Sequence, residues 1–226
     1  MYSLLQKLIK YITYWLTAAN GKGHGIHSPF VFQFVTDILN DNRFFYAFET
    51  LEAIKSQQQE FRKYNQLLFK IVNYYQPKTG LCIDESTNNT INYLAAGNSN
   101  SQIFYKENNL SQEKNNVENY QQLYLENVFL VDDLSLMKTH QYDLVYINTN
   151  NNNNNELENY FQILVPYLTA QSIVIINHIH LGKQFEVTWN NIQHHPSVTL
   201  SIDLFQLGLV FFRPENKVPQ HFTIRF

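Results

Sequence analysis

The chain of 226 residues has a single cysteine, Cys82, and only seven glycines. One thiol cannot form a disulfide within the chain, so the fold must depend on its hydrophobic core. No apolar run approaches the roughly 18 residues that span a bilayer, and no signal peptide with a small-residue cleavage site precedes the first polar stretch. We therefore expect a protein of the cytoplasm without a transmembrane segment.

Positive charge is also scarce. The 16 Lys and Arg residues stand against 19 Asp and Glu residues, which gives a formal net charge of -3. No basic cluster could follow a nucleic-acid backbone, so we expect no nucleic-acid partner. Apolar and aromatic residues are abundant, at 44% and 15%. This is ample material for one well-buried core.

Three of the seven glycines lie in "GKGHGIHSPF", residues 21–30. A lysine among glycines is a feature of phosphate-binding loops, but the Walker spacing is missing and no strand precedes the segment. The segment instead connects a helical pattern over residues 3–17 to a second one over residues 30–38. Its glycines can end the first helix, and Ser28 and Pro29 are the expected N-cap and first turn of the second. We therefore interpret the segment mainly as a junction between helices.

The first predicted helix, residues 3–17, is amphipathic. Its leucines and isoleucines recur at helical spacing, with Lys7, Lys10 and Thr13 on other faces. We expect the apolar face to pack against the rest of the chain. An interfacial membrane anchor and a homodimer surface are the alternatives that this pattern leaves open.

After residue 76, short apolar runs alternate with polar helical segments, which is typical of an α/β fold with a mostly parallel sheet covered on both faces. The segment 1–76, with a further helix over 61–75, is expected to form an N-terminal helical extension packed on an α/β domain of residues 77–226. The "VTLSIDLFQLGLVFFR" segment predicts a closing antiparallel hairpin. The other predicted elements are strands at "LCID" (81), "IFYK" (103), "VFLV" (128), "YDLVYI" (142) and "SIVIIN" (172), and helices at 87–97, 111–123, 156–167 and 184–193.

Four segments carry a resemblance to a known family: "GHGIHSPFVF", "YDLVYIN", "IVIINHIH" and "TWNNIQHHPSVTLSIDLFQLGLVFFR". In these the chain resembles class I S-adenosylmethionine-dependent methyltransferases, in particular small bacterial O-methyltransferase-like proteins with an N-terminal HSPFVF segment. The resemblance implies a Rossmann-like, mostly parallel seven-stranded sheet. It also implies S-adenosylmethionine across the carboxyl ends of the first strands and a small-molecule acceptor.

The resemblance further implies where the cofactor binds. In such families an acidic, glycine-rich turn follows the first strand, whereas here "LCIDESTNNTINYLA" places Cys82 at the acidic position and Asp84 and Asn88 at the glycine positions. Glu107 stands where an acidic residue after the second strand binds both ribose hydroxyls. The resemblance thus implies cofactor contacts by Asp84, Ser86, Asn88, Glu107 and Asn148.

Metal-assisted relatives carry an aspartate at the end of the fourth strand and an acidic pair at the end of the fifth. This sequence has Asn148, Asn177 and His178 there, and neutral side chains hold magnesium poorly, so we expect no metal site. His178 and His180 stand two residues apart, so they would share a face if the strand continued through them. Either one is a candidate general base for an acceptor hydroxyl.

Two functions remain open at this point. The first is methyl transfer from S-adenosylmethionine to a small-molecule hydroxyl. The second is a catalytically degenerate protein of the same fold that acts as a binding or scaffold module, because the turn after the first strand has lost its glycines. Since the resemblance extends through His27 and Ser28, we also expect these two residues to fold over the cofactor side.

Overall fold

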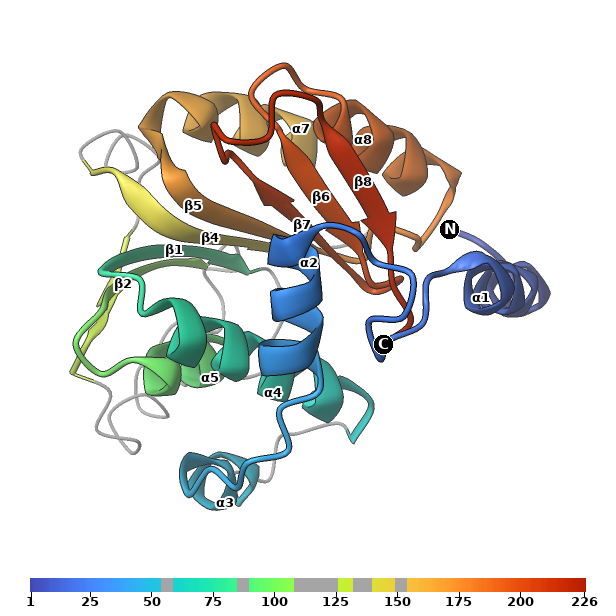
Figure 1. Cartoon of the computed structure of the whole chain (residues 1–226). Helices are drawn as coiled ribbons and strands as arrows, with labels where there is room; N and C mark the ends of the chain where they lie inside the picture. Colours follow the sequence, from blue (N-terminus) through green and yellow to red (C-terminus); the bar gives the residue numbers. More distant parts are fainter. Residues whose placement is uncertain (54–58, 85–89, 108–125, 132–139, 149–153) are drawn as a thin grey trace.

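A central β-sheet lies between two layers of helices in the computed structural model (Figure 1). This arrangement confirms the predicted α/β class. The predicted helix at 111–123 lies outside the described residues. These are 1–53, 59–84, 90–107, 126–131, 140–148 and 154–226.

The sheet has eight strands in the described part of the chain, in the order β3-β2-β1-β4-β5-β7-β6-β8. The strands from β1 to β5 pair in parallel, and β7 runs antiparallel to both β5 and β6. The predicted closing hairpin is therefore confirmed. The strands are β1 (Thr79–Asp84), β2 (Gln102–Glu107), β3 (Val128–Leu130), β4 (Tyr142–Asn148), β5 (Leu168–Asn177), β6 (Leu200–Asp203), β7 (Leu207–Phe211) and β8 (Gln220–Thr223).

The prediction of seven strands is wrong by one, because β8 adds to the edge of the sheet. It pairs in parallel with β6, from Gln220 opposite Leu200 to Thr223 opposite Asp203. The sequence of β8, QHFT, is too short and polar to give a periodic signal. Its strand conformation depends on backbone pairing with β6, which sequence pattern does not reveal.

The helices confirm most of the predicted ones within a few residues. Ser28 caps α2, its side chain accepting a hydrogen bond from the Val31 N–H, and Pro29 follows in the first turn as expected. Gly23 and Gly25 in the preceding junction have φ values of 88° and 81°, which suit glycine. The helical elements are α1 (Leu4–Thr17), α2 (Pro29–Phe34), the π-helical η1 (Val35–Leu39), α3 (Ala47–Glu52), α4 (Gln59–Tyr75), α5 (Thr90–Gly97), α7 (Asn154–Leu164), the 3₁₀ turn η3 (Val165–Tyr167) and α8 (Lys183–Gln193).

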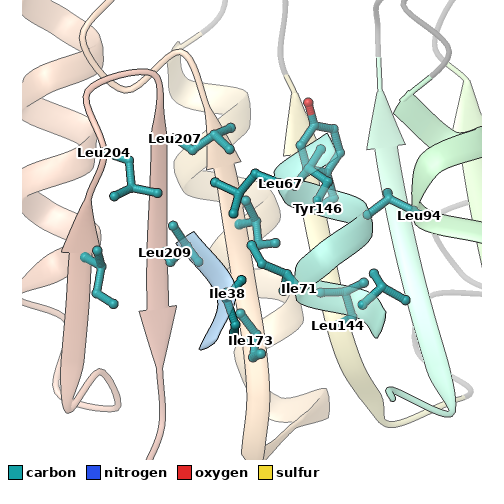
Figure 2. Close-up of a cluster of buried hydrophobic side chains, with 14 of the residues drawn as sticks. Ile38, Leu67, Ile71, Leu94, Leu144, Tyr146, Ile173, Leu204, Leu207 and Leu209 are labelled. Atoms are coloured by element: carbon teal, nitrogen blue, oxygen red, sulfur yellow. The ribbon is translucent and has the colours of Figure 1, made fainter. Parts of the chain in front are cut away.

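The two faces of the sheet bury two separate hydrophobic clusters, because alternate strand residues point to opposite sides. Cys82 faces the layer of α2, α4 and α5, whereas Leu81 and Ile83 face α7 and α8. Figure 2 shows the first cluster, where Ile38 and Ile71 lie over Leu144 and other strand residues. Helix α2, η1 and α4 therefore belong to the main core.

Helix α1 differs from the rest of the N-terminal segment. Tyr14 is its only buried residue, and its leucines and isoleucines are exposed. The expectation that its apolar face packs against the rest of the chain is wrong, because the helix contacts the body through its other side. The expected division into a helical extension of residues 1–76 and an α/β domain of residues 77–226 stays a prediction. Among the described residues, no helix is long and apolar enough to cross a membrane.

Two strand glycines differ in the space around them, and this generates a stability prediction. A Cβ on Gly208 of β7 would lie 2.6 Å from Cζ3 of Trp189, a buried and rigid ring. A Cβ on Gly80 of β1 would meet nothing closer than 3.5 Å. We expect Gly208→Ala to lower the free energy of unfolding by about 2 kcal/mol through overpacking.

The matched variant Gly80→Ala should change the free energy of unfolding by no more than about 0.5 kcal/mol. Urea unfolding followed by circular dichroism measures both. Equal stability of the two variants would show that α8 does not pack against β7 as closely as described.

Candidate functional site

The carboxyl ends of three neighbouring strands bring predicted cofactor residues together. Asp84, the last residue of β1, pairs in register with Glu107 at the end of β2 and with Asn148 at the end of β4. These three of the five predicted residues are therefore neighbours at one edge of the sheet. The other two, Ser86 and Asn88, lie outside the described residues.

Asn148 is the centre of a neutral hydrogen-bonded cluster at this edge. Its side chain is fully buried, and its Oδ1 lies 3.2 Å from Nδ2 of Asn177 and 3.1 Å from Nδ1 of His178. Asn177 in turn accepts a hydrogen bond of 2.9 Å from Nε2 of Gln206. The cluster occupies the positions at which the sequence resemblance would place metal-binding carboxylates.

His178 turns the chain away from the strand direction. Strand β5 ends at Asn177, and His178 has a φ of 62°, with its N–H donating to the Gln206 carbonyl at 2.8 Å. The strand therefore does not continue through His178 and His180, and the two side chains have different partners. The expectation that they share a strand face is wrong.

The surroundings of His178 keep its imidazole neutral. Burial lowers the pKa of His178 to about 4, and the positive charge of Lys7 acts in the same direction. Because Oδ1 of Asn148 accepts hydrogen bonds, Nδ1 of His178 carries the proton and Nε2 is the basic nitrogen. At neutral pH the ring is thus in the form that a general base requires.

His180 is held in the opposite state. Its Nδ1 lies 3.0 Å from Oε1 of Glu186, its Nε2 lies 2.7 Å from Oδ2 of Asp203, and its ring stacks on Phe205 with centroids 5.3 Å apart. Burial lowers the pKa of His180, but the hydrogen bonds and charges of Asp203 and Glu186 outweigh it and raise the pKa above 6.5. With carboxylates on both nitrogens, His180 fits a positioning role better than that of a base.

Helix α1 lies against the loop that carries these histidines. The Tyr2 hydroxyl and the Lys10 ammonium both donate to Oε2 of Glu186, at 2.8 and 2.9 Å, and the Tyr2 N–H donates to the Leu181 carbonyl at 3.1 Å. Burial raises the pKa of Glu186, but the bonds from Lys10, Tyr2 and His180 lower it overall. Sequence reasoning missed these partners because no recognisable spacing connects them to His180.

The segment around His27 lies at the opposite edge of the sheet. His27 and Ser28 line a cavity of about 620 Å³ together with Arg213 and Gln220. Gln220 pairs with Leu200 at the start of β6, which is the amino edge. The expectation that His27 and Ser28 fold over the cofactor side is wrong, because α2 begins at the edge away from Asn148.

The described residues contain no group of three or more His, Cys, Asp or Glu side chains that could hold a metal ion. Two histidines next to α8 pack instead against other rings. His194 lies 4.9 Å from the ring of His221, and His195 lies 5.4 Å from that of Phe161. We assign no metal ligand among them.

Comparison with solved structures identifies the fold. A methyltransferase of Podospora anserina with bound S-adenosylhomocysteine is 11% identical and has a TM-score of 0.61; the match covers 94% of this chain and 98% of that one. The O-methyltransferase TomG of Streptomyces achromogenes, involved in tomaymycin synthesis and solved with S-adenosylmethionine, is 12% identical with a TM-score of 0.59, over 76% and 91% of the two chains.

An O-methyltransferase of Bacillus cereus in complex with S-adenosylhomocysteine is 15% identical, with a TM-score of 0.56, over 80% of this chain and 96% of that one. No family model and no curated protein matches the chain. At these identities the likeness shows the fold alone, which is the Rossmann-like α/β fold of these methyltransferases.

The charge on His180 generates a prediction about pH and stability. The pKa of His180 is raised on folding, so its pairing stabilises the fold fully below the unfolded pKa of 6.5 and is lost as pH rises through the folded pKa. The pKa of Glu186 is lowered on folding, so the stability that its ionised carboxylate contributes is lost as the pH falls below its ordinary pKa of 4.5. We expect His180→Gln to lower the free energy of unfolding by about 3 kcal/mol near pH 6 and by clearly less near pH 9.

Urea unfolding of both proteins at the two pH values measures this difference. His194→Gln, at the exposed end of α8, is the matched control and should have a small effect at either pH. A loss for His180→Gln that is equal at both pH values would show that the ring stabilises by packing and not by charge.

A second prediction concerns the neutral cluster. In an NMR titration of the histidine rings, we expect His178 to titrate at about pH 4. Asn148→Asp places a negative charge on the atom that contacts Nδ1, so the pKa of His178 should rise. The control Asn100→Asp adds the same charge at an exposed turn before β2 and should leave this pKa unchanged. An unaltered His178 titration in Asn148→Asp would contradict the contact.

Proposed function

We propose that this protein binds S-adenosylmethionine at the carboxyl edge of β1, β2 and β4 and methylates the hydroxyl group of a small-molecule acceptor. The register that aligns Asp84, Glu107 and Asn148 at this edge is the observation that carries the proposal. Ligands of open α/β sheets bind outside the carboxyl ends of the strands. The structural neighbours crystallised with S-adenosylmethionine or S-adenosylhomocysteine support the same cofactor.

The residue types at this edge fit the cofactor. Glu107 has the position and the acceptor atoms to bind two ribose hydroxyls, and Asp84 lies beside it at the end of β1. Ser86 and Asn88, which follow Asp84 in the sequence, stay proposed cofactor contacts. In the first turn of the next helix, both amide atoms of Asn92 are buried and have no hydrogen-bond partner among the described residues. A buried unpaired amide is costly, so a polar ligand near this turn fits the chemistry. Bound S-adenosylmethionine supplies an electrophilic methyl group.

His178 is the residue that we assign as base. As the acceptor oxygen becomes a nucleophile, its proton passes to Nε2 of His178, while Nδ1 stays bonded to Asn148. A base with a pKa of about 4 is weak, so orientation of the acceptor must supply most of the rate enhancement. His180, fixed by Glu186 and Asp203, holds the loop that presents His178.

A magnesium-assisted version of this reaction does not fit the donor set. Asn148, Asn177 and His178 form neutral hydrogen bonds with one another where a hard cation needs charged oxygen ligands. The acceptor is therefore a hydroxyl that can be oriented by hydrogen bonds. If the protein is instead a binding or scaffold module without catalysis, we expect it not to bind the cofactor.

Isothermal titration calorimetry with S-adenosylmethionine and S-adenosylhomocysteine tests the proposal. We expect micromolar binding of both and at least about tenfold weaker binding to Glu107→Gln, because this change removes a charged acceptor for the ribose hydroxyls. The matched control is Glu126→Gln. Glu126 lies before β3 at the amino edge of the sheet, so this variant should bind both ligands as the unaltered protein does. Absence of binding to the folded protein would favour the scaffold function.

A further inference from the structure

The first helix is bound to the body of the protein by its polar and aromatic side. Lys10 pairs with Glu186, and the Tyr14 hydroxyl donates to the Ile224 carbonyl. The ring of Tyr11 packs edge-on against Phe205, with centroids 5.1 Å apart. This side of α1 is therefore already occupied by the chain's own residues.

The apolar side of α1 points away from the body. A helix on a protein surface normally does the reverse, burying its apolar stripe and exposing its polar one. Figure 1 shows α1 standing beside the sheet and not over either face of it. Seven large apolar side chains, 49% to 86% exposed, form what we term the outer face of α1: Leu4, Leu5, Leu8, Ile9, Ile12, Trp15 and Leu16.

The size of the outer face matches a protein interface. Taking about 200 Å² for a fully exposed large residue, which is within the range for aromatic side chains, these exposures amount to about 850 Å². The largest apolar patch on an ordinary monomer is about 300–600 Å², whereas a stable interface buries about 800 Å² on each partner. An apolar surface of this extent is expected to be covered.

We propose that the outer face of α1 binds the outer face of α1 in a second copy of this chain, forming a symmetric dimer. Leu4, Leu8, Ile12 and Leu16 lie four residues apart and form one continuous ridge along the helix. Such i, i+4 ridges interdigitate when two helices cross, and the contact is self-complementary about a two-fold axis. The proposal is independent of the methyltransferase function.

The charges on α1 favour a second copy over a membrane surface. Interfacial helices that bind anionic lipids carry several basic residues on the polar side. Here the helix has only Lys7 and Lys10, of which Lys10 is paired with Glu186, and the formal net charge of the chain is -3. None of the side chains of the outer face is itself charged, and the one cation that lies on it among the described residues is the Arg225 guanidinium, over the ring of Trp15 with 4.5 Å to the centroid. Like charges therefore do not oppose two copies along the i, i+4 ridge.

Sedimentation equilibrium of the full chain tests the dimer. We expect a mass of twice 26.7 kDa for the unaltered protein. Leu8→Glu and, separately, Ile12→Glu place a charge on the ridge and should raise the dissociation constant at least about 30-fold. Since both side chains are exposed in one copy, neither change should disrupt its fold, which circular dichroism checks.

Gln6→Glu is the matched control. Gln6 is on the opposite side of the same helix, where it completes the N-terminal capping box, and glutamate can make the same cap. This variant should remain dimeric. A monomeric unaltered protein, or dimers that persist in both ridge variants, would overturn the proposal. Binding of the unaltered monomer to phosphatidylserine vesicles, lost in Leu8→Glu, would instead assign the outer face to membranes.

Discussion

The ring of His180 joins the loop after β5 to two other elements of the protein through a carboxylate on each of its nitrogens. It follows β5, and its two carboxylate partners come from α8 and β6. A partly buried imidazolium is stable only when its charge is paired, so the loop after β5 cannot move without exposing or separating these charges. Asp203 also accepts a hydrogen bond of 2.8 Å from the N–H of Phe205, which fixes the ring on which His180 stacks. His178 lies two residues earlier in the same loop and is therefore held in place as well.

Two histidines in one short loop are thus held in opposite protonation states by their neighbours. His180 lies between carboxylates and is charged, whereas His178 contacts the amide of Asn148 and is kept neutral by burial. The amides of Asn148 and Asn177 at the ends of β4 and β5 therefore have a chemical consequence. They offer a metal ion no charged oxygen ligand and at the same time leave a neutral imidazole at the carboxyl edge.

Sequence pattern predicted the elements whose burial follows a simple period. The alternation of apolar strands and amphipathic helices predicted the α/β class. The family resemblance, and not the period, indicated Asp84, Glu107 and Asn148, which the strand register brings to one edge. The features that sequence pattern did not predict depend on contacts between segments that are distant in the sequence. The strand β8 is held by pairing with β6, and the partners of His180 lie six and 23 residues away. No local period encodes either relationship.

The orientation of α1 is the clearest example of such a distant constraint. Periodicity correctly indicates an amphipathic helix, but it cannot say which side meets the body. Glu186 decides this, because its carboxylate binds His180 on one oxygen and attracts the Lys10 ammonium and the Tyr2 hydroxyl on the other. Once these polar groups face inward, the rigid helix must present its leucines and isoleucines outward. The charge network that fixes the histidine loop is therefore also the physical reason why an apolar surface is left for another molecule to cover.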